Sequence, residues 1–376
     1  MNDVAVAGHY LYIAGADPCF RIVDCSDPLD LAYGGSINLP VEFLNIDVTN
    51  RYAFLIGNEG CLYVIDFVDP IEPVLICRYR ISRRMNDLKV VGERLYAVGS
   101  GLVILDISDL NSIKEIELFD FGGVGTGITV VGERLLVTAG TSGLYTIDCS
   151  DPVAPWVVSV SDIPDNAQSA QVRNEYAYVA DGRSGVRVIS IADPANPVEK
   201  GFVDTPAYAR SVCLFDDYCF VTDEQGGLRV LDISNPSSPQ EIGFYNTPGF
   251  ARGMDLDRNG LIYVADYTNL GIYDVSEIGG VGSRPRLLPS SISLSSYPNP
   301  FNALTTVSFS LPHSSDARLG VFDLMGRNVT QLLPSGHLSA GQHSAVWDAS
   351  GVAAGNYIIR LQTGEETAES KVTLVK

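Results

Sequence analysis

Hydrophobic and polar residues alternate along the first three quarters of the chain in a unit that recurs about every 42 residues. The clearest part of each unit is a short apolar run that ends in Asp, or once in Ser. The end points are Asp24, Asp66, Asp106, Asp148, Ser190, Asp232 and Asp274, spaced 42, 40, 42, 42, 42 and 42 residues apart. A fixed period of this size predicts an array of equivalent supersecondary units.

Each unit divides into four short strands. In the third unit the alternation predicts strands over 87–91, 94–98, 102–107 and 114–119, with a hairpin turn at Gly92-Glu93. After the third strand most units carry Asp-Pro, as at Asp69-Pro70, where the Asx side chain bonds the backbone ahead and Pro fixes φ. Helical periodicity is absent. The pattern therefore predicts an all-β fold, a seven-bladed β-propeller over residues 1–280.

The last unit is incomplete. Strand-like residues continue through 271–275, but Gly-rich sequence follows over 277–283, where a fourth strand should begin. No residue precedes Met1 that could supply the missing outer strand. We therefore expect a seventh blade of three strands, or one completed weakly by residues 284–288.

A second domain follows. Residues 281–296 are rich in Gly, Ser, Pro and Arg, as is typical of an interdomain linker. Residues 297–376 contain alternating stretches at 305–311, 319–324, 345–349, 356–363 and 369–375. This pattern predicts a small Ig-like β-sandwich.

The repeats resemble the LVIVD-repeat family of bacterial β-propellers. The resemblance rests on the seven apolar runs and on the Ser-Asp-Pro turns, and it covers about residues 1–280. The sequence departs from the pattern at Ser190, which replaces Asp, and at Leu110, which replaces Pro. These departures affect single turns.

Residues 297–376 resemble the C-terminal sorting domain of the type IX secretion system, a relative of the FlgD Ig-like domain. The motifs are YPNPFN from Tyr297, VFDLMGR from Val321, VWD from Val346 and AGNY from Ala354. The resemblance implies the type IX secretion machinery as a partner and a secreted or surface-displayed protein. Such cargo also carries an N-terminal signal peptide, which is absent before the first strand, so we expect a truncated N-terminus.

The composition of the chain argues against some classes of function. The 45 acidic and 25 basic residues give a net charge of −20, which argues against a nucleic-acid partner. No apolar run approaches the length of a membrane span. All seven Cys precede residue 220, and most occur where neighbouring repeats have Val, Ala or Gly, so we expect buried thiols and no disulfide between Cys213 and Cys219.

Candidate ligand-binding residues gather at one channel mouth in blades 5–7. The second strands there are expected to end in Asp181, Asp223 and Asp266, where blades 1–4 have Gly or Ala. Beside them lie two Arg, each preceded by an aromatic residue, namely Arg210, Arg252, Tyr208 and Phe250. This set suits a polar ligand such as an extracellular glycan or protein. Alternatively, each Asp caps its own turn and pairs with a neighbouring Arg.

One segment matches a calcium-loop pattern. Asp255, Asp257 and Asn259, followed by Gly260 and then Asp266, have the required order and spacing. The same residues also read as a hairpin, because Asn-Gly between two strand-like runs favours a tight turn. Calcium is therefore a possible cofactor only in the first interpretation, and no other cofactor is expected.

Catalytic motifs are scarce. The propeller has one histidine, His9, and the chain lacks G-x-S-x-G and P-loop sequences. The favoured hypothesis is a non-enzymatic binding or scaffold module. The alternative is an extracellular, glycan-active hydrolase or lyase that uses the mouth carboxylates.

Overall fold

The computed structural model describes residues 2–275 apart from 16–18, 29–30 and 268, and residues 293–375 apart from 298, 300, 312–314, 324, 339–340 and 365–366. These ranges form β-strands and turns and contain no α-helix. In this part of the chain no helix with the length and apolar character of a membrane span is found. The chain divides into two compact units, Met1–Gly271 and Ile272–Lys376.

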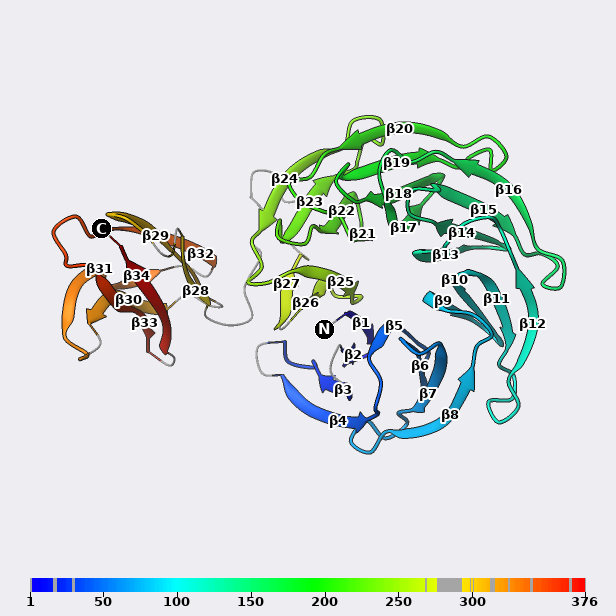
Figure 1. Ribbon diagram of the computed structural model, residues 1–376, viewed down its shortest axis with the longest axis horizontal. Helices are drawn as coiled ribbons and strands as arrows, with labels where there is room; N and C mark the ends of the chain where they lie inside the picture. The colour runs from blue at the N-terminus through cyan, green and yellow to red at the C-terminus, as the bar shows by residue number, and fades with distance from the viewer. Residues whose placement is uncertain are drawn as a thin grey trace. The chain divides into compact units, whose positions relative to one another are not determined.

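The first unit is a ring of antiparallel sheets, each built from consecutive strands (Figure 1). Blades 1–4 comprise β1 (Asp3–Ala7), β2 (Tyr10–Ala14), β3 (Cys19–Asp24), β4 (Ala32–Asn38), β5 (Phe43–Val48), β6 (Tyr52–Gly57), β7 (Cys61–Asp66), β8 (Val74–Arg80), β9 (Met85–Val91), β10 (Arg94–Gly99), β11 (Gly101–Asp106), β12 (Lys114–Phe119), β13 (Gly127–Val131), β14 (Arg134–Thr138), β15 (Leu144–Asp148) and β16 (Trp156–Ser161).

Blades 5–7 comprise β17 (Ala167–Arg173), β18 (Tyr176–Asp181), β19 (Val186–Ser190), β20 (Val198–Val203), β21 (Ser211–Phe215), β22 (Tyr218–Thr222), β23 (Leu228–Asp232), β24 (Gln240–Tyr245), β25 (Ala251–Leu256), β26 (Leu261–Asp266) and β27 (Asn269–Asp274). Six blades have four strands, and the described residues of the seventh have three. The predicted seven-bladed propeller is confirmed.

In at least five of the repeats, the Asp that ends the apolar run caps the turn that follows it. Asp66 accepts a hydrogen bond from the N–H of Val68 at 2.9 Å, and Asp24, Asp106, Asp148 and Asp232 accept the equivalent bond two residues ahead. The next turn uses the same device even without Pro. There Asp109 accepts the N–H of Asn111 at 3.0 Å, although Leu110 stands in the Pro position. The side-chain oxygen therefore directs the chain into this turn.

The hydrophobic core lies between neighbouring blades. In the second and third blades, Phe54 and Ile56 share one cluster with Leu88 and Leu95, and each of these side chains is at most 2% exposed. The third strand, β7, is buried along its whole length, whereas the outer strand β8 is mostly exposed. Inner strands covered on both faces explain the continuous apolar runs of the sequence.

The ring closes where β25 lies beside β1. Gly253 on β25 approaches Asp3 on β1 so closely that there is no room for a Cβ atom. The three strands expected for the seventh blade are present. The alternative completing segment, 284–288, lies outside the described residues.

The second unit has two antiparallel sheets, one ordered β28-β29-β32 and the other β31-β30-β33-β34. Trp347 lies at the centre of its core, 1% exposed, with ring centroids 5.1 Å from Phe301 and 5.4 Å from Tyr357. The strands are β28 (Ser293–Tyr297), β29 (Leu304–Leu311), β30 (Ser315–Asp323), β31 (Asn328–Leu338), β32 (Gly341–Asp348), β33 (Gly355–Thr363) and β34 (Thr367–Leu374). This arrangement agrees with the predicted small β-sandwich.

Two of these strands differ from the sequence expectation. β28 begins at Ser293, inside the segment expected as linker, because it pairs with β29 although its residues are mostly Ser. β31 was not expected, since Pro334 and Gly336 interrupt its apolar pattern. It pairs with β30 through three register shifts, which accommodate these residues.

Candidate functional site at the central channel

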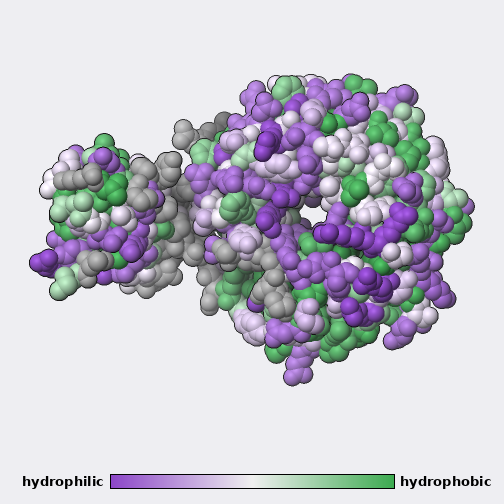
Figure 2. All heavy atoms as spheres, in the orientation of Figure 1, coloured by the Kyte–Doolittle hydropathy of each residue, from purple (hydrophilic) through white to green (hydrophobic). Residues whose placement is uncertain are grey.

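The inner strands of all seven blades surround a cavity of about 920 Å³. The strands are β1, β5, β9, β13, β17, β21 and β25, and hydrophilic residues border the central opening on the face shown in Figure 2. Because the repeats superpose, the lining can be described by inner-strand position, counted from Asn2 in the first blade. We call the end at which this count begins the mouth of the channel.

The second and fourth positions of the inner strands carry the polar side chains that tie the blades together. Most form a hydrogen bond with the backbone of the next blade. At the boundary between blades 6 and 7 this bond comes instead from a side chain of β22. The contacts are Asp3 with Ile46 N (3.3 Å), Asp47 with Val90 N (2.7 Å), Asp87 with Ile128 N (2.7 Å), Thr129 with Ala170 O (2.5 Å), Ser169 with Val212 N (3.1 Å), Gln171 with Leu214 N (3.1 Å), Thr222 with Arg252 O (2.5 Å) and Asp255 with Val6 N (2.8 Å).

Every blade boundary therefore has at least one hydrogen bond from a side chain to the backbone of its neighbour, including the boundary between blades 7 and 1. Of these residues only Asp255 was a candidate from sequence, and as a calcium ligand. A usable signal was present: Asp3, Asn45 and Asp87 recur at the same repeat position, where the other four blades have Gly or Ser.

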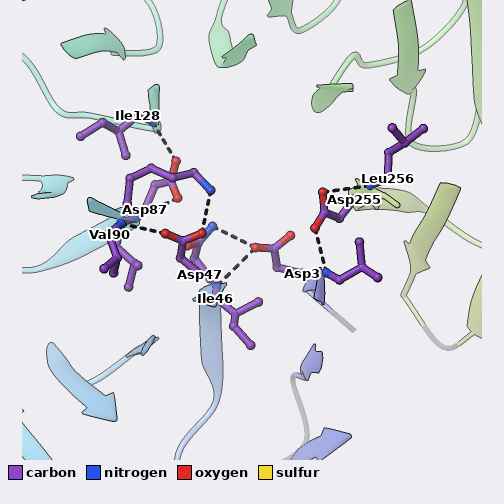
Figure 3. Close-up of polar contacts among 12 residues, drawn as sticks. Asp3, Ile46, Asp47, Asp87, Val90, Ile128, Asp255 and Leu256 are labelled. Atoms are coloured by element: carbon purple, nitrogen blue, oxygen red, sulfur yellow. Dashed lines mark hydrogen bonds and ion pairs between the residues drawn. The ribbon is translucent and has the colours of Figure 1, made fainter. Parts of the chain in front are cut away.

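Four carboxylates lie close together in the channel, those of Asp3, Asp47, Asp87 and Asp255 (Figure 3). Lys89 lies in the same channel wall. Lys89 Nζ lies 3.1 Å from an oxygen of Asp47, and Asp3 also accepts from Asn45 Nδ2 at 3.0 Å. Burial raises the pKa of Asp3 to about 8, with a further contribution from the charge of Asp87. Burial likewise raises the pKa of Asp87 to about 6 and the pKa of Asp255.

Burial alone would lower the pKa of Lys89, but the carboxylates of Asp47 and Asp87 beside it raise it instead. The lysine therefore stays charged and compensates part of the acidic cluster. No three His, Cys, Asp or Glu side chains of the described residues are placed to hold a metal ion. This cluster joins blades and shapes the electrostatics of the channel.

The first position forms a ring of side chains at the mouth: Asn2, Leu44, Asn86, Thr126, Gln168, Arg210 and Arg252. Arg210 donates to Glu224 at 2.8 Å and to Gln168 at 3.1 Å, and its guanidinium lies 5.3 Å from the ring centroid of Tyr208. The sequence expectation that Arg210 and Arg252 line the mouth agrees with their positions in the cavity wall.

Arg252 donates to Asn2 Oδ1 at 3.1 Å and lies 5.0 Å from the ring centroid of Tyr267. Phe250 is 40% exposed and packs edge-on against Tyr267 with a centroid distance of 6.4 Å. Tyr267 and Glu224 were not among the candidates from sequence, because both lie in loops whose path the repeat pattern does not specify.

The three Asp candidates at the mouth are buried beneath the loops. Asp181, Asp223 and Asp266 are 0%, 0% and 1% exposed. Asp181 accepts the N–H of Asn166 at 2.8 Å, and its carboxylate lies 3.5 Å from Arg187 Nε. These carboxylates therefore hold the loops that precede the inner strands, whereas the alternative from sequence had each Asp cap its own turn and pair with a neighbouring Arg.

Asp223 resembles Asp181, whereas Asp266 accepts loop hydrogen bonds but has no arginine at ion-pair distance among the described residues. Asp223 accepts from Thr205 Oγ1 at 2.7 Å and lies 3.7 Å from Arg229 Nε, and Asp266 accepts the N–H of Gly249 at 2.8 Å. Burial raises the pKa of all three. Because these side chains are buried, their exposure does not support ligand binding, which stays a prediction.

The calcium-loop residues do not converge. Asp255 belongs to the channel cluster, whereas Asp257 caps the β25–β26 hairpin by accepting the N–H groups of Asn259 and Leu261 at 2.9 and 2.8 Å. Asp266 pairs with Ala251 at the opposite end of the same sheet. Asp257 and Asn259 thus form a hairpin turn, which is the alternative interpretation of the sequence. Calcium binding stays a prediction, and the four residues do not surround one common position.

Two family models match the chain. The LVIVD repeat matches residues 1–38, 82–120, 164–205 and 206–247, which fall in blades 1, 3, 5 and 6. The secretion system C-terminal sorting domain matches residues 295–375. A comparison with curated proteins gives no match.

Several solved structures share the propeller fold. The β-propeller domain of Myceliophteria thermophila Cps50 (Swd1) is 13% identical with a TM-score of 0.58, over 73% of this chain and 96% of that one. A chain of the mitotic checkpoint complex is 10% identical with a TM-score of 0.62, over 74% and 87%. The Neurospora crassa Pan2 WD40 domain is 11% identical with a TM-score of 0.58, over 72% and 87%. At this identity the likeness concerns the fold alone.

The family matches agree with the two units of the structure. The sorting domain implies interaction with the type IX secretion machinery and delivery out of the cell or to its surface. The chain is thus an LVIVD-repeat β-propeller followed by a secretion system C-terminal sorting domain.

Proposed function

We propose that this chain is an exported bacterial binding or scaffold protein, in which the propeller is the displayed module and residues 295–375 direct its export. The observation that carries the proposal is the sorting domain attached to a propeller whose channel carboxylates are engaged in holding the blades together. Groups committed to backbone contacts are poor candidates for turnover, whereas a rigid ring with a polar mouth suits recognition.

The mouth of blades 6 and 7 is the favoured recognition surface. Arg210 and Arg252 line it, and the exposed rings of Phe250 and Tyr267 border it. Guanidinium and aromatic groups together suit a polar ligand with a flat face, such as a glycan or a segment of an extracellular protein.

The hydrolase or lyase alternative lacks comparable support. General acid–base catalysis requires carboxylates that reach the substrate. Asp181, Asp223 and Asp266 are covered by their own loops and are hydrogen-bonded there. The binding or scaffold function is therefore the better explanation of the mouth.

Export can be tested in a host that has the type IX machinery. The full chain, supplied with an N-terminal signal peptide, is compared with a version that lacks residues 293–376. We expect the propeller outside the cell or on its surface only for the full chain, and in the periplasm for the shortened one. External propeller from both versions would contradict the export role.

Recognition is tested separately by thermal unfolding of the full chain with panels of glycans and peptides. A ligand that binds only the native state at one hundred times its Kd stabilises by about 2.7 kcal/mol. Turnover of any stabilising glycan, abolished in a variant with Asp181, Asp223 and Asp266 changed to Asn, would favour the enzyme alternative instead.

A further inference from the structure

In blades 4–7 the residue directly after Ala139, Asp181, Asp223 or Asp266, in the loop that follows the second strand, adopts the left-handed backbone conformation. Blades 4 and 5 use glycine there, Gly140 with φ 56° and Gly182 with φ 53°. Blades 6 and 7 use Glu224 with φ 41° and Tyr267 with φ 47°. This conformation is unfavourable for residues with a side chain, and especially for a bulky one. The two side chains are therefore held at the mouth at the expense of local backbone strain.

Each of these two side chains contacts the mouth arginine of its own blade. Glu224 accepts a hydrogen bond from Arg210 Nε at 2.8 Å and compensates its charge. At the equivalent place in blade 7, the ring of Tyr267 lies 5.0 Å from the guanidinium of Arg252. An aromatic face attracts a cation but leaves its charge uncompensated. The two blades thus differ by one carboxylate.

Arg252 keeps hydrogen-bonding capacity. Its Nη1 donates to Asn2 Oδ1 at 3.1 Å, and its Nε is buried without a partner. Within the described ranges no carboxylate lies at ion-pair distance from this guanidinium. A guanidinium can bind a carboxylate through two parallel hydrogen bonds.

Two accessible aromatic rings lie next to this arginine. Phe250 is 40% and Tyr267 47% exposed, and their planes meet at 73°. Such large exposed rings form an apolar surface on which the flat face of a ring-shaped ligand can lie. Asn2 in the same ring of mouth residues donates through Nδ2 to Glu42 Oε1 at 3.2 Å and to Phe43 O at 2.8 Å. Its Oδ1, which accepts from Arg252, can accept one further hydrogen bond from a hydroxyl group.

We propose that Arg252, Tyr267, Phe250 and Asn2 form a binding site for an acidic saccharide, in which Arg252 holds a uronate carboxylate and the two rings contact the sugar. This inference rests on the proposed function and specifies the ligand class of the mouth. An acidic sugar combines a carboxylate, hydroxyl groups and a ring with apolar C–H groups, which match the three kinds of side chain present. A simple anion would use only the arginine.

The test is calorimetric titration of the full chain with tetragalacturonate and with its fully methyl-esterified, uncharged counterpart. We expect the ester to bind at least about tenfold more weakly, because a hydrogen bond to a charged group contributes enough for that ratio. Arg252→Gln should weaken tetragalacturonate binding by about tenfold or more. Arg183→Gln is the matched control, since it removes one positive charge from an exposed loop at the same mouth.

Two variants at Tyr267 test the difference between the blades. Tyr267→Glu reproduces the blade 6 arrangement and should abolish binding through compensation of Arg252. Tyr267→Gly reproduces blades 4 and 5, relieves the positive φ and should weaken binding by several fold through loss of the ring. Thermal unfolding of each variant verifies that the propeller remains folded.

Three results would overturn the inference: equal affinity for the acid and its ester, equal losses in Arg252→Gln and Arg183→Gln, or no binding of tetragalacturonate at millimolar concentration. None of them would affect the export experiment. Stabilisation by a different ligand together with any of these results would retain the binding function and remove only the acidic saccharide.

Discussion

The carboxylate of Asp255 in the seventh blade accepts a hydrogen bond from the backbone N–H of Val6 in the first blade, at 2.8 Å and across 249 residues of sequence. The same carboxylate also accepts the N–H of Leu256 at 2.9 Å. The ring is therefore closed by a side chain that bridges two inner strands. Six other boundaries carry comparable bonds, so closure uses the same kind of contact as the rest of the ring.

We expect Asp255→Ala to lower the free energy of unfolding by about 1–3 kcal/mol, because the buried N–H of Val6 loses its acceptor. Chemical denaturation of the full chain measures this loss. Asp69→Ala is the control: its exposed carboxylate also accepts a backbone N–H, from Ile71 at 3.0 Å, but water can replace it. Equal losses of unfolding free energy in the two variants would show that the bond from Asp255 contributes no more than an exposed turn cap.

Stability should fall as pH rises from about 4 to about 8 through the contribution of Asp3. Its pKa is raised by burial from 3.8 to about 8, so the folded state binds a proton that the unfolded state releases. This stabilisation is fully present below the unfolded pKa and is lost as pH rises through the folded value. Asp87, with its pKa raised to about 6, adds the same trend over a narrower window.

Asp3→Asn isolates this contribution, since the amide oxygen can still accept from Ile46 and Asn45. Urea unfolding at pH 5, 6.5 and 8 should show a flatter pH dependence in the variant than in the original chain. Parallel curves for the two proteins would mean that Asp3 is already ionised at pH 5.

Asp223→Ala should destabilise the propeller by about 1–3 kcal/mol, because Arg229, only 7% exposed, would keep only its ion pair with Glu241 at 3.3 Å. Thr205 Oγ1 and the N–H of Ala207 lose their acceptor as well. Thermal unfolding measures the effect. Asp193→Ala, which removes an exposed turn cap, should change stability by about 1 kcal/mol or less. A small effect of Asp223→Ala would return this residue to the list of ligand-binding candidates.

Two glycines with positive φ should respond differently to alanine. Gly92 has φ 59° and open space where a Cβ would lie, so Gly92→Ala should cost about 1–2 kcal/mol of backbone strain alone. Gly227 has φ 78°, and a Cβ there would collide with the carbonyl oxygen of Tyr245. We expect Gly227→Ala to be clearly the more destabilising in denaturant unfolding, and similar effects would contradict the close approach.

Trp347→Ala should unfold the sorting domain and prevent export of the full chain. The side chain is 1% exposed against Phe301 and Tyr357, and loss of a buried aromatic costs about 3–5 kcal/mol. Its neighbour Val346 is 63% exposed, so Val346→Ala serves as the control for folding and export. Normal external levels of the Trp347 variant would show that export does not require the folded sandwich.

Much of the architecture could be predicted from local pattern. The run that ends at Asp66 identifies a buried third strand and its turn, because alternation and Asx capping act between residues close in sequence. The sandwich was harder: β28 lacks an apolar pattern, and β31 contains Pro334 and Gly336. Their strand character comes from pairing with β29 and β30.

The candidate site was predicted only in part. The sequence by itself determined the number of repeats, their strands and turns, and the placement of Arg210 and Arg252 at one end of the inner strands. It could not decide which polar groups are exposed, because burial depends on how the loops fold over the strand ends. The tertiary structure buries Asp181, Asp223 and Asp266 beneath those loops.

Tertiary structure alone also brought Asp255 to Val6 and Tyr267 to Arg252. The first contact exists only once seven blades have closed into a ring, which joins residues from opposite ends of the repeat array. The second depends on the left-handed backbone at Tyr267, a loop conformation that its neighbours impose. Short-range pattern specified the repeated unit, and contacts between units and loops decided which of its residues hold the ring together and which face a ligand.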